Sequence, residues 1–229
     1  ASEAQLRLNP SKDEIANIQE EQRRLAQKQK DDLANANKTA TTKDGHSVEV
    51  VANIANADDA AQAMQMGGEG VGLLRSEFLF MNRGSAPTED EQVESYNAVI
   101  KHLGKDKPLI IRTLDVGGDK PLPYLPIAEE ENPFLGLRGI RVSLQRPAIF
   151  RTQLRAILRS AEYGKVMVMF PMVTTMDDLL RAKAMLEEER EKLGVAAIPV
   201  GIMVEVPSTA VMAEQFAKEV DFFSIGTND

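Results

Sequence analysis

The 229-residue chain is 43% apolar and 27% charged, a composition typical of a globular protein with a substantial core. Its 27 basic and 35 acidic residues give a net charge of −8, which argues against the basic face that binds nucleic acid or an anionic membrane. The chain has no cysteine, which excludes disulfides, cysteine metal sites and a thiol nucleophile within it.

No segment is typical of membrane insertion or secretion. The sequence has no run of 18 apolar residues, the length that a transmembrane helix needs. Its first ten residues, ASEAQLRLNP, lack the basic and then apolar pattern of a signal peptide. We therefore expect a cytoplasmic protein without membrane insertion.

The first forty residues predict a helical lead-in, residues 1–40, before a single domain over residues 41–229. Ser11 and Glu14 have the spacing of a capping box, so we expect a helix near residues 11–37. Its large apolar residues are Ile15, Ile18, Leu25 and Leu33. Because this stripe is too thin for a core helix, we expect an exposed linker helix with one narrow packed seam. A short coiled coil with a partner helix is the alternative.

From Val48 onward, short apolar runs alternate with longer segments of helical periodicity. The apolar runs are residues 48–54, 70–74, 108–114, 165–170, 198–204 and 221–226. This alternation predicts an α/β fold with parallel strands and crossover helices, and continuous apolar strands fit a sheet buried on both faces. A doubly wound sheet and a TIM (β/α)8 barrel both have this pattern. Six units without an early glycine-rich dinucleotide turn favour the barrel.

The last predicted strand lies three residues before the end of the sequence at Asp229, and no helix follows to cover it. A complete barrel has eight strand–helix units. We therefore expect an incomplete barrel of about six units, in a sequence that is cut short. Its edge strands, at 48–54 and 221–226, would lack neighbours and invite association, so we expect a homodimer or a higher oligomer.

Charged and amide side chains follow several of the predicted strands. They are Arg75, Arg112, Asp115, Glu205, Asn228 and Asp229. In parallel α/β folds, ligands bind outside the carboxyl ends of the strands, so these side chains are expected to share one rim. Each of them alone is compatible with a solvated loop or a helix cap. Their convergence on one rim favours a binding site.

These residue types suit an anionic phosphorylated ligand. The guanidinium groups of Arg75 and Arg112 match phosphate and carboxylate oxygens bidentately. Glu205 and Asp229 are suited to Mg²⁺, which commonly takes one or two carboxylates and fills its other positions with substrate oxygens and water. Phosphoryl transfer depends mainly on such positioning and charge neutralisation. The loop of residues 115–120, with two adjacent glycines, adds only weak support because it is typical of a tight turn.

Five segments carry a family resemblance: GGEGVGLLRSEFLFMNR (67–83), IIRTLDVGGDKPLPY (110–124), NPFLGLRGIR (132–141), VGIMVEVPS (200–208) and EVDFFSIGTND (219–229). They closely resemble the C-terminal phosphoenolpyruvate-binding barrel of Enzyme I, the phosphoenolpyruvate–protein phosphotransferase of the bacterial sugar phosphotransferase system. The final segment opens a signature shared by phosphoenolpyruvate-utilising enzymes. LLRSEFLF favours Enzyme I over pyruvate phosphate dikinase and phosphoenolpyruvate synthase.

The resemblance implies a role for each matching residue. Arg75 and Arg112 match the arginines that grip the substrate phosphate, and Arg138 matches a further active-site arginine. Glu205 and Asp229 match two Mg²⁺ ligands, and Asn228 matches a residue that contacts the phosphate. The implied reaction is a transfer, which moves the phosphoryl group from phosphoenolpyruvate to a histidine on a separate domain and then to the carrier protein HPr. A cysteine then protonates the enolate of pyruvate.

The sequence also departs from this family pattern. The phosphorylatable histidine belongs to an N-terminal domain that is absent here, and the cysteine and one further arginine belong to the two missing barrel units. His46 and His102 are the only histidines, and both are expected to be solvated. We therefore expect no turnover by this chain alone. The alternatives are a fragment of a dikinase or synthase, and a non-catalytic module that senses phosphoenolpyruvate or binds a partner.

Overall fold

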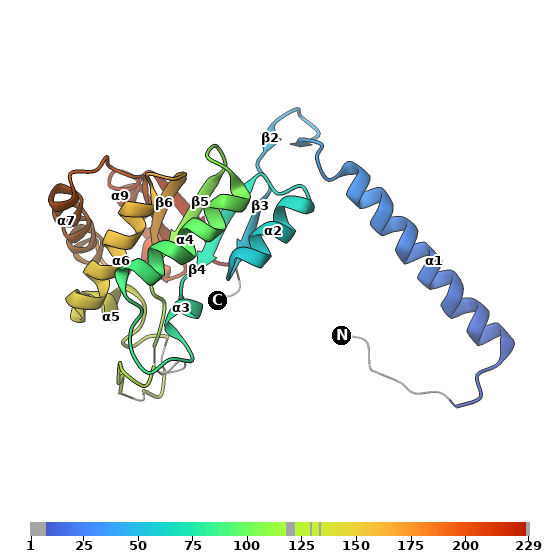
Figure 1. Cartoon of the computed structure of the whole chain (residues 1–229), viewed down its shortest axis with the longest axis horizontal. Helices are drawn as coiled ribbons and strands as arrows, with labels where there is room; N and C mark the ends of the chain where they lie inside the picture. The colour runs from blue at the N-terminus through green and yellow to red at the C-terminus, as the bar shows by residue number, and fades with distance from the viewer. Residues whose placement is uncertain (1–7, 118–121, 129, 133, 228–229) are drawn as a thin grey trace. The chain divides into compact units, whose positions relative to one another are not determined.

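The computed structural model describes residues 8–117, 122–128, 130–132 and 134–227. The chain divides into two units, Ala1–Val48 and Glu49–Asp229. The first contains a long helix and a short hairpin, and the second contains a parallel sheet with its helices (Figure 1). The predicted division into a helical lead-in of residues 1–40 and a barrel domain of residues 41–229 stays a prediction.

The first unit begins with helix α1 (Lys12–Asn35), which is followed by an antiparallel hairpin of β1 (Ala40–Thr41) and β2 (Ser47–Val48). The predicted capping box is present, because the Glu14 amide donates to Ser11 Oγ at 3.2 Å and the Ser11 amide donates to the Glu14 carboxylate at 2.9 Å. None of the residues of α1 is buried within its own unit. The packed seam, which needs a surface outside this unit, stays a prediction.

The second unit is built on a curled sheet of six parallel strands. They are β3 (Val51–Ile54), β4 (Gly70–Arg75), β5 (Pro108–Arg112), β6 (Lys165–Phe170), β7 (Val200–Val204) and β8 (Phe222–Ile225). Each strand pairs with the next along the chain, in the order β3-β4-β5-β6-β7-β8. A doubly wound sheet reverses its strand order at a switch point, whereas a barrel keeps chain order. The prediction of an incomplete α/β barrel is therefore confirmed.

Helices follow the strands as crossover connections. They are α2 (Ala57–Gln65), α3 (Glu77–Phe80), α4 (Glu89–Leu103), α5 (Ile140–Gln145), α6 (Pro147–Ser160), α7 (Met176–Leu193), α8 (Pro207–Val211) and α9 (Ala213–Phe216). Figure 1 shows α2, α4, α6 and α7 ranged along the sheet in chain order. Among the described residues, no helix is long and apolar enough to cross a membrane.

The sheet packs apolar side chains on both of its faces. Because side chains alternate along a strand, Val168 and Phe170 join the large core that the helices cover, while Met169 lies in a separate cluster with Leu73 and Met203. On the helix-covered face, the rings of Phe150 and Phe170 meet edge to face at 6.1 Å. Burial on both faces explains why the inner strands β4 to β7 are continuous apolar runs in the sequence.

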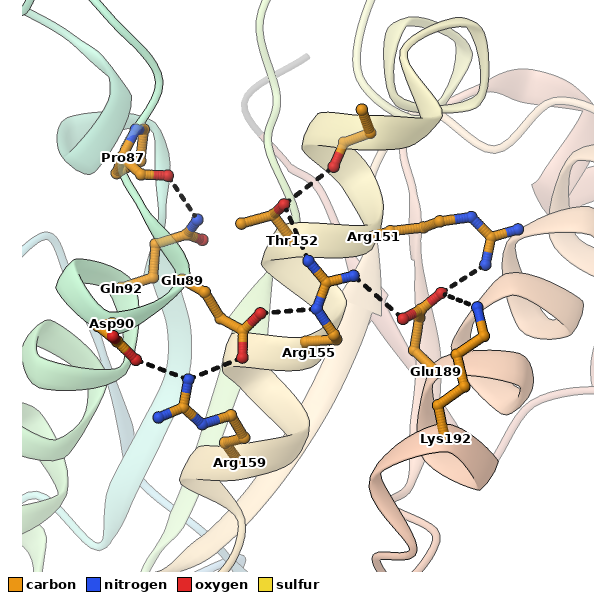
Figure 2. Close-up of polar contacts among 11 residues, drawn as sticks. Pro87, Glu89, Asp90, Gln92, Arg151, Thr152, Arg155, Arg159, Glu189 and Lys192 are labelled. Carbon is orange, nitrogen blue, oxygen red and sulfur yellow. Dashed lines mark hydrogen bonds and ion pairs between the residues drawn. The ribbon is translucent and has the colours of Figure 1, made fainter.

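An ion-pair network joins three of the covering helices (Figure 2). Helix α6 presents three arginines spaced one turn apart, Arg151, Arg155 and Arg159. Glu89 on α4 accepts hydrogen bonds from Arg155 Nε at 2.6 Å and from Arg159 Nη1 at 2.7 Å. On the other side of α6, Glu189 on α7 accepts from Arg151 Nη1 at 2.6 Å and from Arg155 Nη1 at 3.1 Å. The network therefore fixes α6 between α4 and α7.

Glu189 is the most buried acid of this network, with a side chain only 2% exposed. Burial disfavours its charged form, but hydrogen bonds from Lys192, Arg151 and Arg155 outweigh burial and lower the pKa of the carboxyl from 4.5 to about 2. A carboxyl with a lower pKa in the folded state stabilises the fold above its unfolded pKa. That contribution is lost as the pH falls from about 4.5 towards 2.

Replacing this carboxylate tests the network. We expect Glu189→Gln to lower the free energy of unfolding at pH 7 by about 3 kcal/mol, the equivalent of the depressed pKa. Urea titrations should show that the difference in the free energy of unfolding between the variant and wild type becomes smaller as the pH falls from 4.5 to 2. Glu188→Gln is the matched control, because Glu188 is 53% exposed and its pair with Arg151 should contribute less than about 1 kcal/mol. Equal effects of the two substitutions would contradict this account.

Candidate functional site

A cavity of about 440 Å³ lies at the carboxyl ends of the strands, and we call it the rim cavity. It is lined by residues of β3, β4, β5, β7 and β8 and of the segments that follow them. Four predicted site residues line it, namely Arg75, Arg112, Arg138 and Glu205. The other two, Asn228 and Asp229, lie outside the described residues, as do residues 118–120 of the predicted glycine loop. The structure thus brings together every predicted site residue that it describes.

Two of these arginines are neighbours across the sheet. Arg75 ends β4 and Arg112 ends β5, and the strand register pairs their Cα positions. Arg75 is exposed and makes no hydrogen bond or ion pair with any residue that the structure describes. Its guanidinium is therefore available to an anion in the rim cavity.

Arg112 is buried and held by carboxylates. Its Nη2 pairs with Glu77 and lies 3.2 Å from Asp115 Oδ2. Its Nη1 contacts the thioether sulfur of Met203 at 3.6 Å, and a thioether is a weak acceptor. The two ends of this guanidinium thus differ, because Nη2 faces two carboxylates and Nη1 faces a sulfur.

Arg138 is fixed by the same aspartate. Its Nε lies 3.1 Å from Asp115 Oδ1 and its Nη2 lies 3.3 Å from Asp115 Oδ2, which is the bidentate geometry of a strong charge-assisted pair. The Phe134 ring stacks on this guanidinium, with its centroid 4.3 Å from Cζ. Asp115 therefore links Arg112 to Arg138.

The turn after Arg138 requires glycine. Gly139 has a φ of 58°, and a Cβ there would lie 2.9 Å from the Met172 side chain and 3.2 Å from Asp115 Oδ1. A side chain at this position would press on the aspartate that links the two arginines.

Glu205 is oriented by a backbone amide. Its Oε1 accepts a hydrogen bond of 2.6 Å from the amide of Met172, which has a φ of 57° in the left-handed region that non-glycine residues rarely adopt. The carboxylate is an oxygen donor in the rim cavity, which suits a hard cation. Among the described residues, no three acidic or histidine side chains form a metal-binding group. The other predicted metal ligand, Asp229, is not among those residues.

Both histidines are exposed, and neither lines the rim cavity. This agrees with the expectation that His46 and His102 are solvated. Among the described residues, the acidic side chains that line the rim cavity are those of Glu77, Asp115 and Glu205.

Sequence reasoning missed Gln153, which joins the two arginine-bearing strand ends. The Leu114 amide donates to its Oε1 at 2.9 Å, and its Nε2 donates to Ser76 Oγ at 2.9 Å. Leu114 lies two residues after Arg112, and Ser76 directly follows Arg75. A signal was present in the sequence, because Gln153 interrupts the apolar face of its predicted helix. Glu77 was missed as well, although it lies two residues after Arg75.

Gln153→Ala tests this bridge. The substitution leaves the buried Leu114 amide without an acceptor, so we expect a loss of about 1–3 kcal/mol in the free energy of unfolding. Gln62→Ala on the exposed face of α2 is the matched control and should change stability by less than about 0.5 kcal/mol. Urea denaturation of both variants gives the measurement, and a Gln153→Ala protein as stable as wild type would contradict the bridging role.

Comparison with known proteins adds independent information. Residues 28–229 match a family model described as "PEP-utilising enzyme, PEP-binding domain". The phosphoenolpyruvate-protein phosphotransferase of Bacillus subtilis (strain 168) is 55% identical over 199 residues, which are 84% of this chain and 35% of that protein. The proteins of the same name from Geobacillus stearothermophilus and Staphylococcus carnosus (strain TM300) are 49% and 50% identical, and the matches cover 99% and 97% of this chain. The chain spans 35–40% of the length of these relatives.

Proposed function

Because the chain belongs to the phosphoenolpyruvate-utilising enzymes, whose phosphoenolpyruvate-binding domain it matches, we propose that the rim cavity binds phosphoenolpyruvate. The observation that carries this proposal is the pair of arginines on adjacent strand ends. Arg75 and Arg112 share a register position, line one cavity and lie beside a third arginine, Arg138. Arginine is the side chain best suited to bidentate binding of phosphate and carboxylate.

Each residue has a separate task in this proposal. Arg75 and Arg112 bind the phosphate oxygens, and Arg138 contributes a further positive charge beside them. Asn228 is proposed to contact the phosphate as well. All these roles rest on the resemblance of the sequence motifs, and for the three arginines they are also supported by the shared cavity.

A divalent cation fits the charge balance of the rim cavity. Among the described residues, the charged side chains that line it are three arginines and three carboxylates, Arg75, Arg112, Arg138, Glu77, Asp115 and Glu205, so the formal charges of this described set cancel. A phosphoenolpyruvate anion therefore needs a cation to neutralise it. We propose Mg²⁺ held by Glu205 and Asp229, which would neutralise charge on the phosphate and enolate oxygens.

For the whole protein, we propose phosphoryl transfer from phosphoenolpyruvate to a histidine and on to HPr during sugar uptake in the bacterial cytoplasm. The names of the relatives, all phosphoenolpyruvate-protein phosphotransferases, support this reading over a dikinase or a synthase. Within the 229 residues themselves, there is no cysteine to protonate the enolate. We therefore propose that this chain alone binds the substrate without turning it over.

Arg75→Ala tests the proposed site. We expect wild-type chain to bind phosphoenolpyruvate in the presence of Mg²⁺, and the variant to bind about 10- to 100-fold more weakly, because a hydrogen bond to a charged group is lost. Isothermal titration calorimetry measures the affinity, and Arg24→Ala on the exposed α1 is the matched control. With radiolabelled phosphoenolpyruvate, no phosphohistidine should form. Equal affinity of wild type and Arg75→Ala, or stoichiometric phosphohistidine, would contradict the proposal.

We also propose that the chain associates through its sheet edges. Strand β8 is an edge of the sheet, and its Ile225 is 74% exposed. Unpaired edges with exposed apolar residues favour pairing with another chain. Light scattering at high concentration should give the mass of a dimer or larger, and Ile225→Lys should reduce it, whereas Tyr163→Lys at another exposed position should not. A monomer at high concentration would count against this.

A further inference from the structure

We propose that Glu77 is a positioning residue for Arg112. The buried carboxylate of Glu77 holds the guanidinium of Arg112 so that Nη1 is presented to the phosphate of the ligand. The inference rests on the proposed function, phosphoenolpyruvate binding, and adds how one of the two phosphate-binding arginines is fixed. Glu77 is the first residue of α3, and its carboxylate pairs with Arg112 Nη2.

The pair is buried, which makes the carboxylate consequential. The side chain of Glu77 is 4% exposed and that of Arg112 is 9% exposed. A buried guanidinium needs a counter-charge, because burial of an unpaired charge is strongly unfavourable. Arg75 has the paired register position on β4, so a second positive charge lies at the end of the neighbouring strand. A carboxylate beside Arg112 offsets both the cost of burying its charge and the repulsion between the two arginines.

Asp115 does not fulfil this task alone. Both of its carboxylate oxygens are engaged by Arg138, at 3.1 Å and 3.3 Å. Its contact with Arg112 is a single one of 3.2 Å, to Nη2. Glu77 pairs with the same nitrogen from a different element, α3. The two carboxylates together fix Nη2 from two directions and so set the plane of the guanidinium.

Because the carboxylates hold Nη2 of Arg112, its other terminal nitrogen, Nη1, is left for the ligand. The only polar contact of Nη1 among the described residues is the sulfur of Met203, which also lines the rim cavity. A phosphate oxygen is a far stronger acceptor than a thioether and would replace it. Glu77 also lies two residues after Arg75, so one short segment carries one phosphate-binding arginine and the carboxylate that fixes the other.

Two ligands separate a positioning role from a merely structural one. Phosphoenolpyruvate carries the phosphate that Arg112 is proposed to bind, whereas oxalate has carboxylates and no phosphate. The experiment measures the dissociation constants of both for the full 229-residue chain with Mg²⁺ by calorimetry. Glu77→Gln keeps the shape of the side chain and an oxygen acceptor while removing the charge. Glu69→Gln is the matched control, because it makes the same change at the amino end of β4, away from the rim cavity. There the Glu69 carboxylate accepts a hydrogen bond from the Val50 amide.

We expect Glu77→Gln to weaken phosphoenolpyruvate binding by about tenfold or more, the effect of losing a hydrogen bond between charged groups. Oxalate binding should change less than about twofold, and Glu69→Gln should change neither affinity. In an Arg112→Lys background, the substitution of Glu77 should have little further effect, because the two residues act as one unit. Tighter phosphoenolpyruvate binding by Glu77→Gln would show that Glu77 competes with the phosphate, and an equal loss for both ligands would show a structural role. Either result overturns the inference.

A second readout needs no ligand. The Nη protons of Arg112, identified by their loss in Arg112→Lys, should give resolved NMR signals in wild type because the carboxylates slow rotation of the guanidinium. In Glu77→Gln these signals should broaden or merge, and unchanged signals would overturn the inference. A wild-type chain that binds no phosphoenolpyruvate would contradict the proposed function, and the guanidinium signals would then decide whether Glu77 holds Arg112.

Discussion

Parallel pairing in chain order is the constraint on which the site depends. Every strand of the second unit runs in the same direction and pairs with its successor, so the carboxyl ends of all six strands lie along one rim. Arg75, Arg112 and Glu205 come together there although they are separated by up to 130 positions of sequence. The covering helices maintain this arrangement, because the ion pairs of Figure 2 fix α6 and Gln153 on α6 bonds both arginine-bearing strand ends.

The chemistry of the rim cavity follows from the burial of positive charge. Arg112 and Arg138 are buried, and each is paired with a carboxylate that also lines the cavity. Such pairs add little net stability, but they fix the direction in which a guanidinium points. Arg75 differs because it is exposed and unpaired among the described residues. Within the part of the chain that the structure describes, the cavity thus combines one unpaired guanidinium with two oriented ones, an arrangement suited to holding a phosphate in a defined pose.

The sequence was informative where a single local pattern decided the structure. Each of the six apolar runs contains one strand of the sheet, although the run 48–54 is divided and only Val51–Ile54 joins the sheet, while Val48 lies in the hairpin strand β2. The Ser11–Glu14 spacing became a helix cap, because a cap depends on neighbouring residues. The packed seam of α1 stays a prediction, because it depends on a surface outside the first unit. Glu77 and Gln153 were missed since their partners lie 35 and up to 77 positions away, and only the tertiary fold brings them together. The sequence favoured a barrel over a doubly wound sheet, and the observed strand order decided between them.

A crystal structure of the chain with phosphoenolpyruvate and Mg²⁺ tests the central claim most directly. The account predicts the phosphate in the rim cavity, within hydrogen-bond distance of Arg75 and of Nη1 of Arg112, with the metal ion on the Glu205 carboxylate. Phosphoenolpyruvate bound elsewhere on the molecule, or with its phosphate turned away from both arginines, would contradict it.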